Sequence, residues 1–516
     1  MKVVFRADAS TRIGSGHVMR CATLAEELRR RGAIVSFLCR SMEGDYIEWL
    51  TERGIEVARL PETPAGDDGG NRADSYAGWL GVTLEQEIAQ VTARLEAIGS
   101  VDWLVVDHYA LDAKWEKAMR AQVDKILCID DLADRRHDCD MLLDQNHRAE
   151  PARRYSALVP RDAKTLLGPR YALLRPEFAL WRRELRARDG TVRRVLLFMG
   201  GSDIGNATMI ALQAVGQYRL GTATWQVDVV VGAGNPYFAD IEALCEGAAG
   251  ISLHRNVGSN EMAALMASAD LAIGAGGTSN WERACLGLPS LIFALADNQK
   301  LPLRQLVEDG YVAGEDRTPN MARLTYWLDL LAANPAWLRG LGKRSATLVD
   351  GDGVRRVADR MLSTQITFRR ATMADCEDVW CWRNAPAVRL SSISQGEIDL
   401  ASHEQWFAKT LEDQDRILLI AEWSRKPIGV VRFDVDGSLA TVSVFRVADV
   451  AAPGGLVRAA SQWLMKNRPD LAGIIAEVLT GNEVSLAAFL DAGYRQVKNT
   501  LLLELGSDRH EQATSR

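Results

Sequence analysis

The stretch KVVFRADASTRIGSGHVMRCATLAEELRRRGAIVSFLC, residues 2–39, holds the pattern of a strand, a helix and a second strand. Residues 2–8 form a short apolar run, residues 17–32 repeat apolar side chains at helical spacing and end in a glycine, and residues 33–39 are apolar again. This order predicts a βαβ unit on a parallel sheet, so the chain begins as an α/β protein.

The same alternation continues along the chain. Apolar runs at 102–109, 125–132 and 140–146 each end in polar residues, where the carboxyl end of a strand binds ligands in such sheets. A segment rich in Arg and Pro at about 147–190 breaks the rhythm. It restarts in four further runs, at 193–203, 225–235, 250–257 and 270–294. We expect two Rossmann-like halves, residues 1–180 and 190–362, with a ligand between them.

The composition changes after a helical stretch at about 321–362. Three strand-like runs, 416–423, 427–435 and 441–447, then follow one another with short turns. They predict a third domain of α+β type with antiparallel character, residues 366–505. The polar tail at 506–516 is expected to fray.

Composition narrows the setting. The 516 residues are 47% hydrophobic and 25% charged, with a net charge of −7. These values are typical of a globular protein and argue against a nucleic-acid or anionic-membrane partner, which needs a concentrated basic surface. Eight cysteines without CxxC pairing are expected to be buried free thiols. No apolar run is long enough for a membrane span, and we expect a cytoplasmic protein of undetermined oligomeric state.

The turn Gly14-Ser15-Gly16 opens the first helix. Glycines permit a tight turn there, and the helix N-terminus behind them favours an anion. A dinucleotide motif, GxGxxG, is excluded because position 19 is Met19 and no acidic residue ends the second strand. His17 lies in the first turn of this helix, where the dipole favours a neutral ring that can accept a proton.

Two more glycine turns occur in the second half. Residues 274–289, GAGGTSNWERACLGLP, repeat a strand, a glycine turn and a helix, and residues 199–203, MGGSD, form the other turn. Backbone N–H groups at such turns can approach a diphosphate, and Glu282 is placed to accept ribose hydroxyls. The predicted substrate-binding residues here are Gly200, Gly201, Gly276, Gly277, Thr278, Ser279 and Glu282.

The motifs RADASTRIGSGHVMRCATLA, VDHYALDAKWE, DDLADRRHDCDMLLDQN, GGSD, GAGGTSNWERACLGLP and ADNQ occur in this order. Over about residues 1–345 the chain resembles the UDP-sugar hydrolases of pseudaminic acid biosynthesis. The resemblance implies a GT-B fold and hydrolysis of UDP-2,4-diacetamido-2,4,6-trideoxy-β-L-altrose to the free sugar and UDP. It also implies that no metal is required, and a place in nonulosonic acid biosynthesis and flagellin glycosylation.

The resemblance further implies catalytic roles for His17, Tyr109 and Asn298, with Gly14 shaping the loop. We expect His17 to deprotonate water that attacks the anomeric carbon, and backbone N–H groups, with Arg12 or Arg20, to bind the departing diphosphate.

Other polar residues near these motifs allow more than one interpretation. Asp107 either orients a neighbouring side chain or only caps the end of a backbone segment. Asp130 and Asp131 resemble an acid–base or metal pair, but Arg135 and Arg136 beside them favour a structural ion-pair network. Two histidines, His137 and His147, are expected at the surface.

Residues 366–505 resemble the GNAT N-acetyltransferases, on the motifs FRRATMADCEDVWCWRN, TVSVFRV, PGGLVRAASQWL and LTGNEVSLAAFLDAGY. The resemblance implies that acetyl-CoA is a cosubstrate and that the 4-amino group of the UDP-sugar precursor is acetylated. Departing from the family, the glycine turn at Pro453 lacks the usual Arg or Gln. A domain kept only for docking is the alternative. The residues expected at the coenzyme are Gly454, Gly455, Asn482, Ser485 and Tyr494.

We therefore expect a bifunctional enzyme. One alternative is a glycosyltransferase that uses a UDP-sugar donor and needs an acceptor other than water. Another is a regulator that binds a UDP-sugar without turnover, with a non-catalytic GNAT domain.

Overall fold

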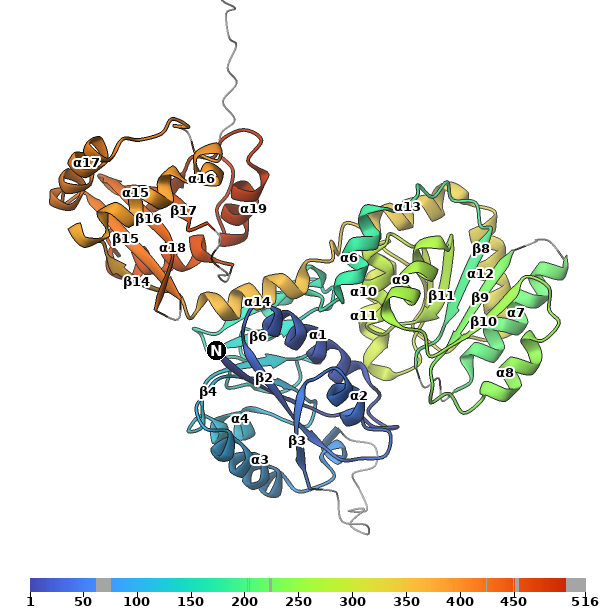
Figure 1. Ribbon diagram of the computed structural model, residues 1–516. Helices are drawn as coiled ribbons and strands as arrows, with labels where there is room; N and C mark the ends of the chain where they lie inside the picture. The colour runs from blue at the N-terminus through green and yellow to red at the C-terminus, as the bar shows by residue number, and fades with distance from the viewer. Residues whose placement is uncertain are drawn as a thin grey trace, which may run out of the picture. The chain divides into compact units, whose positions relative to one another are not determined.

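The computed structural model describes residues 1–61, 76–201, 203, 205–221, 225–392, 394–423, 425–448, 450 and 454–497. The chain divides into two compact units, Met1–Ala358 and Asp359–Arg516 (Figure 1). Among the described residues, no helix is both long and apolar enough to cross a membrane.

The first unit opens with a seven-stranded sheet in which every pairing is parallel. The strand order is β3-β2-β1-β4-β5-β6-β7, so the chain runs outward in both directions from the neighbours β1 and β4. The strands are β1 (Lys2–Ala7), β2 (Ile34–Arg40), β3 (Glu56–Leu60), β4 (Val101–Asp107), β5 (Val123–Ile129), β6 (Met141–Asp144) and β7 (Lys164–Leu167).

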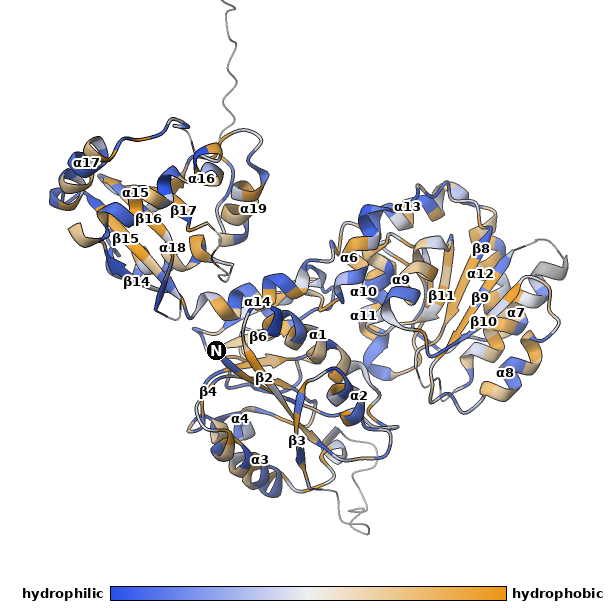
Figure 2. Cartoon of the chain, viewed as in Figure 1, coloured by the Kyte–Doolittle hydropathy of each residue, from blue (hydrophilic) through white to orange (hydrophobic). Residues whose placement is uncertain are grey.

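Helices cover both faces of this sheet because its central strands are largely apolar (Figure 2). Helices α3 (Leu84–Ile98) and α4 (Ala113–Met119) bury one face, and their core includes Val4, Leu104 and Trp115. Helix α1 (Gly16–Arg30) packs against β1, β2 and β4, and Figure 1 shows it on the other side of the sheet. The remaining helical segments of this part are α2 (Ile47–Glu52), η1 (Tyr76–Leu80), α5 (Pro151–Tyr155), η2 (Pro169–Tyr171) and α6 (Pro176–Arg183).

A second parallel sheet follows, with the order β10-β9-β8-β11-β12-β13. Here β8 and β11 are the neighbours from which the chain runs outward. The strands are β8 (Arg194–Phe198), β9 (Gln226–Val231), β10 (Ile251–Arg255), β11 (Leu271–Ala275), β12 (Ser290–Phe293) and β13 (Ala313–Glu315). The helices are α7 (Ala207–Gly221), α8 (Phe238–Cys245), α9 (Ser259–Ser268), α10 (Ser279–Cys285), α11 (Asp297–Glu308), α12 (Met321–Ala332) and α13 (Pro335–Ser345).

The second unit contains a five-stranded sheet of order β14-β15-β16-β17-β18. The first four strands pair antiparallel and β18 pairs parallel to β17. The strands are β14 (Thr367–Arg370), β15 (Arg416–Trp423), β16 (Lys426–Asp436), β17 (Leu439–Arg446) and β18 (Gly473–Ala476). Helix α14 (Gly353–Ser363) leads from the first unit into the second, where the helical segments are η3 (Met373–Asp375), α15 (Cys376–Asn384), α16 (Pro386–Leu390), α17 (Leu400–Glu412), α18 (Leu456–Asn467) and α19 (Glu483–Ala492).

The predicted fold class is confirmed: two parallel-sheet halves are followed by a mostly antiparallel α+β unit. The segment at about 147–190 does not simply break the rhythm, since it supplies β7, which completes the first sheet. The predicted third domain ends at residue 505, which lies outside the described residues, as do Pro453 and the tail at 506–516. The predicted domain boundaries stay predictions.

Candidate active site

The carboxyl ends of β1 and β4 carry the first group of polar side chains. In open parallel sheets, ligands bind where neighbouring strands lead the chain in opposite directions. Gly14 takes a left-handed backbone, with φ of 79°. The Ser10 hydroxyl accepts the N–H of Ile13 at 3.0 Å, which tightens the loop. Helix α1 then begins at Gly16 with Ser15 as its N-cap, so its free N–H groups lie at this edge of the sheet.

His17 and Asp107 form a buried pair across this edge. His17 Nδ1 lies 2.6 Å from Asp107 Oδ1, and the Asp107 side chain is fully buried. The His17 side chain is 10% exposed. A carboxylate at Nδ1 fixes the ring orientation and directs Nε2 away from the carboxylate. The pair is thus arranged for His17 to accept a proton at Nε2. Asp107 orients the His17 ring, which is one of the two roles that the sequence left open for Asp107.

Arg20 completes this pair from the next turn of α1. Its Nε and NH2 groups donate to Asp107 at 2.6 and 2.7 Å, and NH1 donates to Asp131 at 2.7 Å. Burial alone would raise the pKa of Asp107, but Arg20 and His17 hold it well below its ordinary value. The guanidinium is therefore committed to two carboxylates, and the expected binding of a diphosphate by Arg20 has no support in this arrangement. Arg12 is exposed.

Tyr109 lies beside the pair. Its hydroxyl donates to Asp131 Oδ2 at 2.8 Å, and its ring meets that of His17 edge-on with centroids 4.7 Å apart. Burial, followed by the charge of Asp131, raises the pKa of the Tyr109 hydroxyl well above its ordinary value. Tyr109 therefore stays protonated at neutral pH and is a hydrogen-bond donor. Asp130 and Asp131 have different partners. Asp130 pairs with Arg135 at 2.9 Å as expected, whereas Asp131 contacts Arg20 and Tyr109 in the site.

Two aromatic residues that sequence reasoning did not single out join this group. Trp79 stacks on Tyr109 with centroids 5.3 Å apart and meets His17 edge-on at 5.8 Å. The ring centroid of Tyr76 lies 5.0 Å from the ring centroids of both Trp79 and Tyr109. Tyr76 and Trp79 belong to the short helical segment η1 (Tyr76–Leu80), and two aromatics at a spacing of three were the available signal. We call Tyr76, Trp79 and Tyr109 the aromatic cluster.

The glycine turns of the second half lie at the carboxyl ends of β8 and β11. A Cβ added to Gly200, Gly201 or Gly277 would meet no atom within 4 Å. At Gly276 it would lie 3.3 Å from Gln299 Cβ, so this glycine packs on the ADNQ segment. The open backbone at these turns leaves room for a ligand.

Other predicted residues of this half have structural partners. Thr278 is the N-cap of α10, which has only seven residues, and the Ser279 hydroxyl accepts from Arg283 at 3.4 Å. The Glu282 carboxylate pairs with Arg175 at 3.1 Å, and its side chain is 16% exposed. Recognition of a ribose by Glu282 therefore requires sharing the carboxylate with Arg175, and it stays a prediction.

Asn298 is exposed in the first turn of α11. Among the described contacts, no hydrogen bond joins it to His17 or Tyr109. Its neighbour Asp297 nevertheless acts on the aromatic cluster: burial raises the pKa of Tyr76, and the charges of Asp134 and Asp297 raise it further. The start of α11 is thus within electrostatic reach of Tyr76. The catalytic role of Asn298 stays a prediction.

One group of described residues has metal-ligating side chains: Glu116, Cys128 and His137, all buried. His137 Nδ1 and Cys128 Sγ already bind Glu116 Oε1, at 2.7 and 3.0 Å. Burial lowers the pKa of His137, but Asp130 and Glu116 outweigh it and raise the pKa to about 9. We assign this group a structural role, as a buried ion pair.

The expectation that His137 lies at the surface is wrong, because it is only 5% exposed. His147, which was also expected at the surface, is partly buried with its side chain 20% exposed, and it pairs with Asp309 at 2.7 Å. Seven of the eight cysteines are buried free thiols as expected, while Cys381 is exposed.

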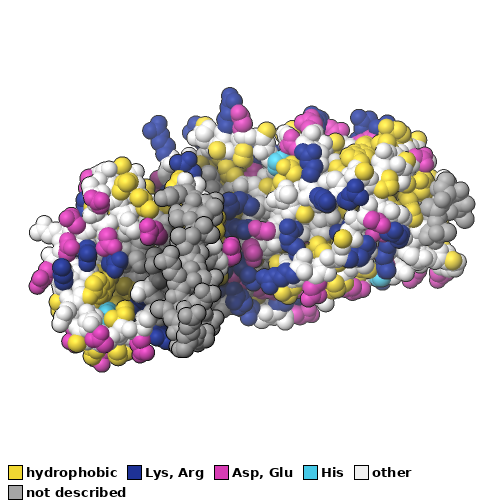
Figure 3. Space-filling view, turned by 90° about the horizontal axis from the view of Figure 1, so that it is seen from above, with side chains coloured by type: hydrophobic (Ala, Val, Ile, Leu, Met, Phe, Trp, Pro, Cys, Tyr) yellow, Lys and Arg dark blue, Asp and Glu magenta, His cyan; other side chains and the backbone are white. Residues whose placement is uncertain are grey.

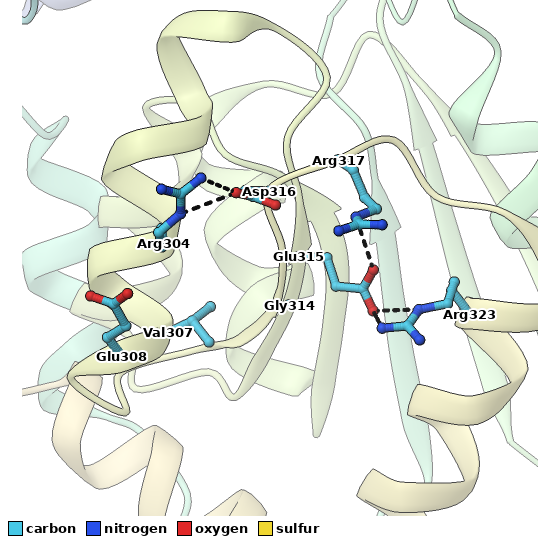
Figure 4. A pocket seen from close by; sticks show the side chains of 8 residues that line it. All are labelled: Arg304, Val307, Glu308, Gly314, Glu315, Asp316, Arg317 and Arg323. Atoms are coloured by element: carbon cyan, nitrogen blue, oxygen red, sulfur yellow. Dashed lines mark hydrogen bonds and ion pairs between the residues drawn. The ribbon is translucent and has the colours of Figure 1, made fainter.

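A shallow pocket of about 250 Å³ lies beside β13 (Figure 4). Arg304 pairs with Asp316 at 2.5 Å, and Arg317 lies 3.7 Å from Glu315. Arg323 also binds Glu315. Since each arginine faces a carboxylate, the pocket offers little net charge to an anion. Basic and acidic side chains are likewise interspersed over the face that Figure 3 shows.

The residues expected at the coenzyme in the second unit have other partners. Asn482 Oδ1 accepts the N–H of Ser485 at 3.0 Å and caps α19. The Tyr494 hydroxyl shares a 2.9 Å hydrogen bond with Ser461, and burial raises its pKa. The pairing of β17 with β18 ends at Val442 and Ala476, where β18 ends, while β17 continues to Arg446.

The glycine turn does not fit a coenzyme diphosphate in this structure. A Cβ added at Gly454 would overlap the carboxylate of Asp359, which therefore packs directly on the turn. The space that a diphosphate needs at the start of α18 is taken by a negatively charged side chain.

Comparisons with known proteins find relatives of parts of the chain. No family model matches the chain. It is 26% identical over 258 residues to the UDP-2,4-diacetamido-2,4,6-trideoxy-beta-L-altropyranose hydrolase of Campylobacter jejuni. The aligned region covers 50% of this chain and 77% of the hydrolase.

Two solved structures resemble parts of the chain. MurG of Acinetobacter baumannii covers 70% of it and 98% of its own chain, with 14% identity and a TM-score of 0.48. The acetyltransferase AAC(6')-Ib, solved with ribostamycin and coenzyme A, covers 26% of this chain and 84% of its own, with 18% identity and a TM-score of 0.24. The chain is thus similar to a nucleotide-sugar hydrolase over about half its length and has GNAT acetyltransferases among its structural neighbours.

Proposed function

We propose that the first unit hydrolyses a UDP-linked sugar, with His17 as the general base. The buried pair of His17 and Asp107, at the switch point of the first sheet, is the observation that carries this proposal. The relative from Campylobacter jejuni supports UDP-2,4-diacetamido-2,4,6-trideoxy-β-L-altrose as the substrate. The reaction is then a step of nonulosonic acid biosynthesis, and its link to pseudaminic acid and flagellin glycosylation is part of the proposal.

The proposed steps assign a role to each of these side chains. His17 Nε2 takes a proton from water while the water oxygen attacks the anomeric carbon. The bond between that carbon and the diphosphate oxygen breaks, and UDP leaves with the bonding electrons. Asp107 stabilises the imidazolium that forms, as a carboxylate does at Nδ1. The N–H groups at the start of α1 stabilise the charge on the departing diphosphate. The Tyr109 hydroxyl, whose proton is donated to Asp131, accepts a hydrogen bond from a sugar hydroxyl at its oxygen.

The test is turnover of the purified full chain, followed by NMR of the anomeric signal and by release of UDP. We expect hydrolysis without an added acceptor, and incorporation of oxygen-18 from labelled water into the sugar. The variant His17→Ala should lose at least about 100-fold in kcat, the low end for loss of a general base. Near-normal turnover by this variant would refute the base assignment.

Two other results would favour the rival functions. Turnover only with an added sugar or lipid acceptor would identify a glycosyltransferase, and binding without turnover would identify a regulator. Acetyl-CoA-dependent acetylation of the 4-amino precursor by the second unit is part of the sequence prediction. The same assay with the 4-amino UDP-sugar, with and without acetyl-CoA, tests it separately from hydrolysis.

A further inference from the structure

One face of α14 packs against the glycine turn that precedes α18. Asp359 and Ser363 are four residues apart, so both side chains lie on the same face of the helix. The Asp359 carboxylate occupies the position next to Gly454, with Oδ2 2.7 Å from where a Cβ would be. At Gly455, whose φ is 82°, an added Cβ would lie 2.9 Å from Ser363 Cβ. The close approach of α14 therefore accounts for both glycines without any coenzyme.

The electrostatics of this contact resemble those of an anion site. The first N–H groups of α18 have no partners within the helix, and the helix dipole places partial positive charge there. The first turn of α18 contains no acidic residue. Its basic residue, Arg458, turns to the end of α19, where its guanidinium lies 3.4 Å from Asp491 Oδ2. The carboxylate of Asp359 lies against Gly454, two residues before α18 begins.

The place for a pantetheine arm is different. In a GNAT fold the arm lies where these two strands stop pairing, and here the pairing of β17 with β18 ends at Val442 and Ala476 while β17 continues to Arg446. Asp359 lies at the glycine turn and not among these strand residues. The contact with α14 therefore affects the diphosphate end of a coenzyme and not its thiol arm.

We propose that Asp359 competes with the diphosphate of coenzyme A for the N-terminus of α18. Coenzyme binds this unit tightly only when the Asp359 side chain leaves the turn. The helix that links the two units thereby carries an internal competitor of the coenzyme. This inference rests on the proposed use of coenzyme A by the second unit, and it does not depend on the proposed hydrolysis.

The test is calorimetric titration of the full chain with coenzyme A and, separately, with pantetheine, which has no phosphate. Asp359→Asn keeps the shape of the side chain and removes its charge, and Asp359→Ser also opens space. The matched control is Asp470→Asn, which removes an exposed carboxylate of the same unit that pairs with Arg468. Circular dichroism melting checks that each variant is folded.

We expect both Asp359 variants to bind coenzyme A at least about tenfold more tightly than the natural chain, because a like charge is removed from the diphosphate position. Pantetheine affinity should change by less than about twofold, and Asp470→Asn should change neither. Three results would overturn the proposal: an unchanged coenzyme A affinity in both variants, no coenzyme binding by any of the proteins, or an equal gain for pantetheine. Loss of hydrolysis in the other assay leaves these expectations intact.

Discussion

Replacing Asp107 by Asn tests most directly whether the pair of Asp107 with His17 makes His17 the general base. The substitution removes the negative charge 2.6 Å from His17 Nδ1 and keeps the volume of the side chain. It also presents an amide N–H₂ group that can donate to Nδ1, which would leave the proton on Nε2, where water must be deprotonated. The geometry therefore predicts a loss in kcat with little change in KM, since Asp107 is fully buried and does not reach the substrate.

The magnitude follows from the hydrogen bond that is lost. A hydrogen bond to a charged group contributes about 1.5–3 kcal/mol. At about 1.36 kcal/mol for each factor of ten in rate, kcat should fall roughly 10- to 150-fold, and further where the amide fixes the wrong tautomer. Stability should also fall, because Arg20 loses one of its two carboxylates and is itself buried.

The assay is UDP release under saturating substrate, at a temperature where melting shows that the variant is folded. Asp131→Asn is the matched control: it weakens the 2.7 Å contact to Arg20 and the hydrogen bond from Tyr109, and leaves the pair of His17 with Asp107 in place. It should lower stability similarly and kcat by less than about tenfold. The reasoning fails if Asp107→Asn keeps kcat within about threefold of the natural chain. It also fails if the two variants lose kcat equally, since the loss would then come from Arg20.

Two further predictions concern the loop and the buried ion pair. Gly14→Ala should destabilise the fold by about 1 kcal/mol, because φ of 79° is left-handed. Gly16→Ala should leave the melting temperature unchanged but raise KM if the start of α1 approaches the diphosphate; equal KM values for both variants and the natural chain would contradict this role. For His137, the pKa is raised from 6.5 to about 9, so its stabilising contribution is complete below about pH 6.5 and is lost as pH rises through about 9. We expect the free energy of unfolding of the natural chain, measured in urea relative to that of His137→Gln, to fall by up to about 3 kcal/mol between pH 6.5 and 9.5. A fall of less than about 1 kcal/mol would show that the pair of His137 with Glu116 is not charged.

Local pattern predicted much of the fold. Continuous apolar strands separated by helical periods identify a parallel sheet from short windows, and residues 2–39 did so. Short strands escaped this reasoning. The strand β13 has three residues, Ala313–Glu315, and becomes a strand by pairing with β12 and not through its own propensity.

The candidate site was predictable in part. A histidine after a glycine turn pointed to His17, and Tyr109 followed the end of a strand. Their partners could not be ranked, because Asp107, Asp131 and Trp79 are 90, 114 and 62 residues from His17 in the sequence. Only the pairing of β1 with β4 places Asp107 beside His17.

The sequence by itself predicted the order of the longer strands and helices, the Gly14 turn and a histidine as the candidate base, since these depend on neighbours within a few residues. The tertiary structure alone decided which charges meet. Arg20 was predicted for a diphosphate and is held by Asp107 and Asp131, and Gly454 was predicted for a coenzyme and receives Asp359. Ion pairing and burial act through space between residues far apart in the chain, and a one-dimensional pattern does not record that proximity.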